Sequence, residues 1–143
     1  MRKVVIGSDK EGFQLKEHLK NHLLNLGWDV IDKTPTKELD FVESSKLVAQ
    51  AILNKEGEKG ILIDEYGSGS FMVANKHKGI ICAQVADEHS AKMTRDHNNT
   101  SIITIGASVT GLKLAERIVE EFTKSEYSGG RHQIRVDMLN KMC

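Results

Sequence analysis

The chain has 143 residues, 39% of them hydrophobic and 28% charged, and this length and composition are typical of a single globular domain with one core. Twenty basic residues balance twenty acidic ones, which excludes an overall charge that would draw the chain to nucleic acid or to an anionic membrane. No apolar run approaches the roughly 20 residues that span a bilayer, and two cysteines, Cys82 and Cys143, are too few for a disulfide framework, so we expect a cytoplasmic location.

Short apolar, β-branched segments alternate with longer amphipathic segments along most of the chain. In chain order they predict a strand at Val4–Gly7, a helix at Glu11–Leu26, a strand at Trp28–Asp32, a helix at Val42–Lys55, a strand at Gly60–Ile63, a helix beginning near Ser70, a strand at Ile80–Val85, a helix beginning near Ala86, a strand at Ser101–Ile105 and a helix at Gly111–Lys124. Because the strands are continuously apolar and are separated by helices, the sequence predicts a parallel sheet with helices on both faces.

The chain after Lys124 differs from this alternating pattern. Glu126–Gly130 is a turn-rich break, and Arg131–Met142 predicts a short amphipathic helix with basic residues. We treat residues 1–143 as one domain and expect residues 125–143 to form a C-terminal arm that packs on a partner subunit.

Polar residues that could carry chemistry follow the first and third predicted strands. Asp9 lies in the segment Gly7–Gly12, where its carboxylate could hold a sugar hydroxyl or could simply cap the next helix. The segment Asp64–Ser70 contains two glycines and two serines before a helix, so its backbone N–H groups could face an anion. A tight strand-to-helix turn explains the same residues without a ligand, and the segment lacks the Gly-Lys-Ser/Thr of a P-loop.

Two further groups of residues have side chains suited to a phosphorylated substrate. His97 could exchange protons near neutral pH, and the amide of Asn98 could hold a developing oxyanion, although both residues also suit a solvated turn. Arg131 and Arg135 lie four residues apart, so on a helix their forked donors could bind one phosphate, whereas the alternative is a solvated basic face. The remaining histidines show no metal-ligand spacing, so we expect no metal.

In their order and spacing, these segments resemble the family of type B ribose-5-phosphate isomerases and galactose-6-phosphate isomerases along essentially the whole chain. The closing run, Gly129–Cys143, is similar to the A-type subunits of galactose-6-phosphate isomerases in particular. The resemblance rests on five segments: Gly7-Ser8-Asp9, Gly60–Ile63, Ala74-Asn75-Lys76, His97-Asn98-Asn99 and Gly129–Val136.

The resemblance implies a three-layer α/β/α, Rossmann-like domain with a five-stranded parallel sheet and a C-terminal helical arm. It also implies conversion of D-galactose 6-phosphate to D-tagatose 6-phosphate through an enediolate, in galactose and lactose catabolism, with no cofactor. His97 matches the family's ring-opening acid–base, and Asn98 matches a residue near the developing oxyanion. Asp9 matches a sugar-binding aspartate, and Arg131 and Arg135 match the phosphate clamp.

Three departures from the family pattern lie close together in the expected site. Asp64 stands where the family's proton-abstracting cysteine follows the third strand, Tyr66 replaces a threonine, and Lys10 replaces a histidine. Because family sites lie between subunits, the resemblance implies that this chain gives its His-Asn and Arg-Arg residues to a site whose cysteine comes from a homologous B-type subunit. The expected assembly is a hetero-oligomer.

Two alternatives stay open at this point. The chain could be a self-sufficient homodimeric isomerase of the ribose-5-phosphate type, with Asp64 as its base. It could also be a non-catalytic subunit that binds a sugar phosphate or stabilises its partner.

Overall fold

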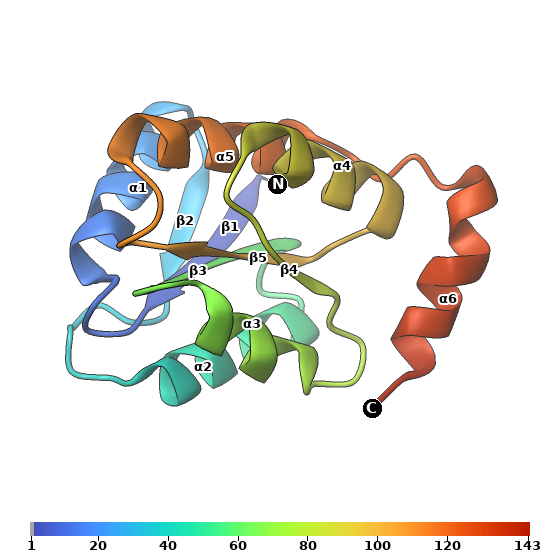
Figure 1. The fold of residues 1–143 in the computed structure, drawn as a ribbon, viewed down its shortest axis with the longest axis horizontal. Coiled ribbons are helices and arrows are strands. Elements are labelled where there is room, and N and C mark those ends of the chain that lie inside the picture. Colours follow the sequence, from blue (N-terminus) through green and yellow to red (C-terminus); the bar gives the residue numbers. More distant parts are fainter. Residues whose placement is uncertain (1) are drawn as a thin grey trace.

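The computed structural model describes residues 2–143, which fold into a three-layer α/β/α domain (Figure 1). In chain order the elements are β1 (Lys3–Ser8), α1 (Phe13–Asn25), β2 (Asp29–Asp32), α2 (Phe41–Leu53), β3 (Lys59–Asp64), α3 (Ser68–Asn75), β4 (Cys82–Gln84), α4 (Glu88–Asn98), β5 (Ile102–Gly106), α5 (Leu112–Lys124), the 3-10 turn η1 (Gly130–His132) and α6 (Gln133–Lys141). The strand order is β2-β1-β3-β5-β4, and every neighbouring pair is parallel. The predicted fold class is confirmed.

Helices α1, α4 and α5 cover one face of the sheet, while α2 and α3 cover the other (Figure 1). Along β1, Val4 and Ile6 join the core on the first face, and Val5 joins the core on the second. Strands β3 and β5 alternate in the same way, because successive side chains of a strand point to opposite faces. Both faces are buried, which explains why the central strands β1, β3 and β5 are mainly apolar on both faces.

Most predicted elements are present, with boundaries that differ by a few residues. Helix α4 begins at Glu88 rather than near Ala86, because the carboxylate of Asp87 accepts a hydrogen bond from the backbone N–H of Ser90 at 2.6 Å and caps it. Its last turn contains His97 and Asn98, and the left-handed backbone of Asn99 (φ 54°) ends it. The fourth strand is shorter than predicted.

Strand β4 lies at the edge of the sheet and has three residues. The side chain of Asn75, at the end of α3, donates to the carbonyl of Cys82 at 2.9 Å and accepts from the N–H of Cys82 at 3.0 Å. The side-chain amide of Asn75 thus makes two hydrogen bonds to the backbone of Cys82, as a neighbouring strand would.

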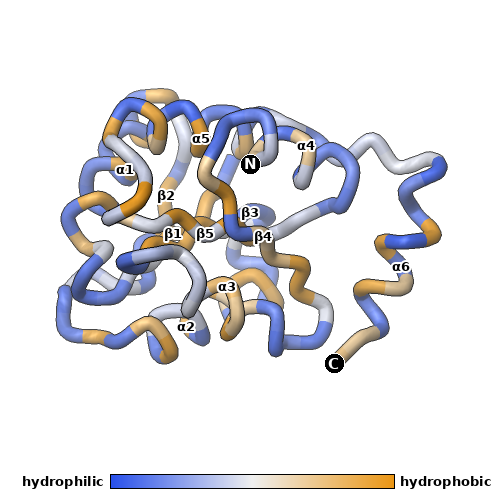
Figure 2. Tube along the Cα trace, in the orientation of Figure 1, coloured by the Kyte–Doolittle hydropathy of each residue, from blue (hydrophilic) through white to orange (hydrophobic). Residues whose placement is uncertain are grey.

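The C-terminal arm leaves the domain after α5 and stands apart from it (Figure 1). On α6 only Val136 is buried, whereas the side chains of Ile134 and Met138 are 71% and 58% exposed. Figure 2 shows these hydrophobic positions in orange along α6, away from the core. The packing of this arm on a partner stays a prediction. Within residues 2–143, no helix combines the length and the apolar character that a bilayer crossing requires.

A buried lysine fixes the root of the arm. The Lys59 side chain is 2% exposed, and its Nζ donates to the carbonyls of Thr123 and Ser125 (2.9 Å to Ser125) and to the carboxylate of Glu126 at 3.1 Å. Burial lowers the pKa of Lys59, and the Glu126 carboxylate opposes that shift. The lysine therefore ties the end of α5 and the first residues of the arm to β3.

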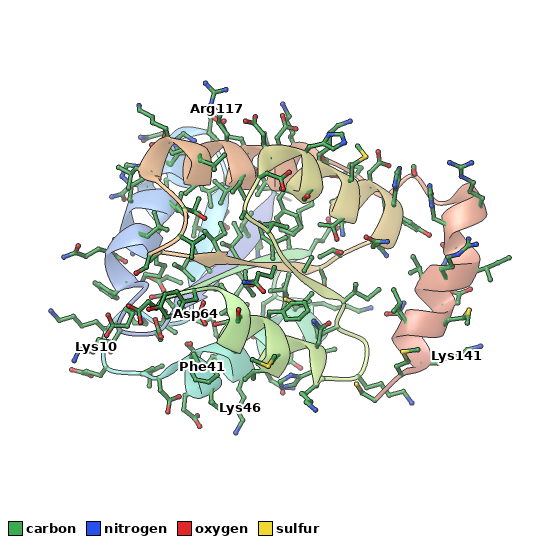
Figure 3. All side chains as sticks on the ribbon, in the orientation of Figure 1. Lys10, Phe41, Lys46, Asp64, Arg117 and Lys141 are labelled. Atoms are coloured by element: carbon green, nitrogen blue, oxygen red, sulfur yellow. The ribbon has the colours of Figure 1, made fainter. Side chains whose placement is uncertain are left out.

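We expect Lys59→Met to lower the free energy of unfolding by about 1–3 kcal/mol, because it leaves two buried carbonyls without a donor. Urea unfolding followed by circular dichroism measures the loss. The matched control is Lys46→Met on α2, since the Lys46 side chain is 57% exposed (Figure 3), and its expected change is within about 0.5 kcal/mol. Equal losses in the two variants would contradict the assigned role of Lys59.

Candidate active site

The predicted site residues occupy two separate places on the chain. The first place, which we call the carboxyl-edge half-site, consists of Asp9 after β1 and the segment Asp64–Ser70, which runs from the last residue of β3 into the first turn of α3. The second place, the arm half-site, combines the last turn of α4 with the start of the arm and contains His97, Asn98, Arg131, His132 and Arg135. Helix α4 starts beyond the carboxyl end of β4 and runs back to the amino end of β5, so the two half-sites lie at opposite ends of the sheet.

In the carboxyl-edge half-site, Asp9 is nearly buried and holds the turn between β1 and α1. Its Oδ1 accepts from the backbone N–H of Gly12 at 2.8 Å, and its own N–H donates to the carbonyl of Ile63 at 3.3 Å. Burial raises the pKa of Asp9, and the nearby charge of Asp64 adds to the rise. A Cβ at Gly12 would lie 2.4 Å from the Ile63 carbonyl oxygen, so the close approach of this turn to β3 requires glycine.

Asp64 lies between the end of β3 and the start of α3 (Figure 3) and is 5% exposed. Its Oδ1 accepts from the N–H of Gly67 at 2.5 Å, and its Oδ2 accepts from the N–H of Ser70 at 3.1 Å. Gly67 has a left-handed backbone (φ 86°), which lets the loop fold around the carboxylate. The carboxylate of Asp64 therefore accepts hydrogen bonds from backbone N–H groups that could otherwise face an anion.

Three neighbouring side chains complete the carboxyl-edge half-site. Tyr66 is 59% exposed, and Lys10 lines an open surface hollow beside the β1–α1 turn. Ser8 and Ser70 are fully buried, and within residues 2–143 their hydroxyl oxygens have no hydrogen-bond partner. Nothing in the sequence distinguishes Ser8 from an ordinary turn serine, because the distinguishing feature is its burial.

In the arm half-site, the imidazole of His97 stacks on the imidazole of His132. The ring centroids are 4.3 Å apart and the ring planes differ by 17°. The N–H and the hydroxyl of Ser128 both donate to the carbonyl of Asp96, at 3.0 and 3.1 Å, and hold the arm against the end of α4. Loss of solvent around the ring lowers the pKa of His132, and the neighbouring His97 and Arg131 lower it further.

Arg131 and Arg135 are exposed and lie near the histidine pair. Asn98 is also exposed, and together with Leu139 of α6 it lines a groove of about 580 Å³ between the domain and the arm. The four residues for which the sequence suggested proton transfer and phosphate binding therefore lie near one another, and their roles stay predictions. Asp9 does not join them, because it lies in the other half-site.

Residues 2–143 contain no cluster of three or more His, Cys, Asp or Glu side chains that could hold a metal ion. Burial raises the pKa of the Cys82 thiol, so it stays protonated at neutral pH. A larger groove at the amino end of the sheet, lined by Lys3, Arg95 and Glu126 among others, contains none of the predicted site residues.

Comparisons with known proteins find relatives along nearly the whole chain. The family model described as Ribose/Galactose Isomerase matches residues 4–139. The chain is 59% identical over 140 residues to the galactose-6-phosphate isomerase subunit LacA of Clostridium acetobutylicum, covering 98% of this chain and 99% of that one. It is 52% identical to the subunit of the same name from Staphylococcus aureus, with the same coverage.

Solved structures show the same fold at lower identity. A ribose 5-phosphate isomerase from Thermotoga maritima superposes with a TM-score of 0.93 at 36% identity, covering 98% of both chains. Ribose-5-phosphate isomerase B from Mycoplasma genitalium, solved with bound ribulose-5-phosphate, gives 0.91 at 32% identity and covers 97% of this chain and 94% of that one. By sequence over nearly its whole length and by fold, the chain belongs to the ribose/galactose isomerase family.

Proposed function

We propose that the chain is the A-type subunit of a galactose-6-phosphate isomerase, which converts D-galactose 6-phosphate to D-tagatose 6-phosphate together with a homologous, cysteine-bearing subunit. The similarity to two LacA subunits, at 59% and 52% identity, supports this substrate. The observation that carries the proposal is the composition of the arm half-site, where an acid–base histidine, an amide and two exposed arginines lie together.

The chemistry of the reaction suits these groups. Arg131 and Arg135 can bind the phosphate through forked donors. The His97 imidazole can take the proton of the anomeric hydroxyl and return a proton to the ring oxygen, which opens the sugar ring. A base then removes the proton at carbon 2 to form the enediolate, Asn98 donates to the developing oxyanion, and a proton returns to carbon 1. Aldose and ketose are isomers, so the reaction needs no redox cofactor.

The missing base is the reason for proposing a partner. Both oxygens of Asp64 accept backbone hydrogen bonds at the start of α3, so its carboxylate is engaged in holding the loop. The arm half-site faces away from this loop, and its groove and exposed apolar helix offer a surface to another subunit. We propose a cytoplasmic location, which suits the two free cysteines, Cys82 and Cys143.

Isomerase activity on galactose 6-phosphate should appear only when this chain is co-expressed with a cysteine-bearing homologue. The assay measures tagatose 6-phosphate formed by the purified chain, by the partner and by the complex. Turnover by the purified chain alone would overturn the shared site and favour the self-sufficient homodimer. Absence of turnover in a fully assembled complex would overturn the substrate.

His97→Ala should lower kcat of the assembled complex by about 10²-fold or more, because a general acid–base group contributes about 10²–10⁴-fold. Size-exclusion chromatography of the variant complex controls for loss of assembly. A near-normal rate in an assembled complex would instead support a scaffold subunit.

Asp64→Asn should leave kcat of the complex within about twofold of the wild type but lower the free energy of unfolding by about 1–3 kcal/mol. The stability loss follows because an amide has one acceptor oxygen, while two backbone N–H groups face this side chain. Glu65→Gln, at the next residue, is the matched control. A loss of turnover of about 10²-fold or more in Asp64→Asn alone would identify Asp64 as a base.

A further inference from the structure

The stacked histidines come from separate elements, since His97 lies in the last turn of α4 and His132 ends η1. The nearly parallel rings place one face of each imidazole against the other. Two glycines before His132 have left-handed backbones, with φ of 66° at Gly129 and 59° at Gly130. Only this turn, with the bonds from Ser128 to Asp96, brings the arm's histidine onto the end of α4.

The stack is the contact that orients the His97 ring. Within residues 2–143, the ring hydrogen bonds of histidines belong to His18, His22 and His77, and none reaches the nitrogens of His97. Packing against His132 therefore sets the plane of the His97 ring and leaves both of its nitrogens free for a substrate.

The charges around the pair act on the protonation of His132. Loss of solvent around the ring lowers the pKa of His132, and His97, Arg131 and Arg135 lower it further, whereas Asp96 opposes the shift. A neutral His132 ring stacks on His97 without the repulsion that two positive rings 4.3 Å apart would have.

We propose that His132 is a positioning residue that acts through His97, because its ring sets the plane of the His97 imidazole. This inference rests on the proposed function, in which neutral His97 accepts a proton from the sugar. It gives the arm a second task besides phosphate binding, because the same segment that carries the arginines also orients the acid–base group of its own chain.

Two substitutions test this role. His132→Ala removes the ring, so we expect kcat of the complex to fall about tenfold or more through misplacement of His97. His132→Phe keeps an aromatic ring against His97, so kcat should return to within about threefold of the wild type.

An NMR spectrum of the full-length chain tests the stack without any turnover. The His97 ring signal, assigned by its loss in His97→Gln, should shift in His132→Ala, which removes the ring current of the stacked imidazole, and should return towards its wild-type position in His132→Phe. His89→Ala is the control, because His89 is exposed at the opposite end of α4, and it should leave both the signal and kcat unchanged.

The outcomes distinguish this inference from the proposed function. An unchanged His97 ring signal in His132→Ala, or equal loss of kcat in the Phe and Ala variants, overturns the positioning role. Equal increases of KM in both variants, with kcat unchanged, would instead make His132 a direct phosphate contact and also overturn it. A shifted His97 signal in the His132→Ala chain, when the wild-type complex fails to isomerise galactose 6-phosphate, supports the stack and refutes only the proposed function.

Discussion

The direction of α4 is the constraint on which the organisation of the site depends. In a parallel sheet each helix must carry the chain back from the carboxyl end of one strand to the amino end of the next. The last turn of α4 therefore lies across the domain from the loops after β1 and β3. His97 is separated from Asp64 by the length of the strands. A single chain cannot bring these two groups to one substrate, so the fold favours a site completed by another subunit.

The hydrogen bonds of Asp64 indicate how the carboxyl-edge half-site can change while the arm half-site keeps its residues. A carboxylate at the end of β3 reaches the N–H groups of Gly67 and Ser70 and acts as a built-in anion for the start of α3. The loop is then held by the protein itself and not by a ligand. Within the arm, by contrast, Arg131 and Arg135 remain exposed.

The sequence was sufficient to predict the fold, because short apolar runs that alternate with amphipathic helices are typical of a parallel sheet buried on both faces. The resemblance carried by short segments led us to expect His97, Arg131 and Arg135 in one site, and the structure places the three near one another. The stack on His132 and the anchoring of the arm by Lys59 could not be predicted, because each joins residues far apart in the chain. Neither contact leaves a local pattern: a histidine after an arginine and a lysine before a strand are both ordinary on a surface.

The bonding of Asn75 to Cys82 limits how copies of the domain can meet. The unpaired N–H and carbonyl groups of an edge strand can ordinarily form hydrogen bonds to another strand, which then adds to the sheet. Here the first residue of a three-residue edge strand already has both groups bonded by an amide side chain. Addition of a strand from another molecule is therefore disfavoured at the β4 edge of the sheet.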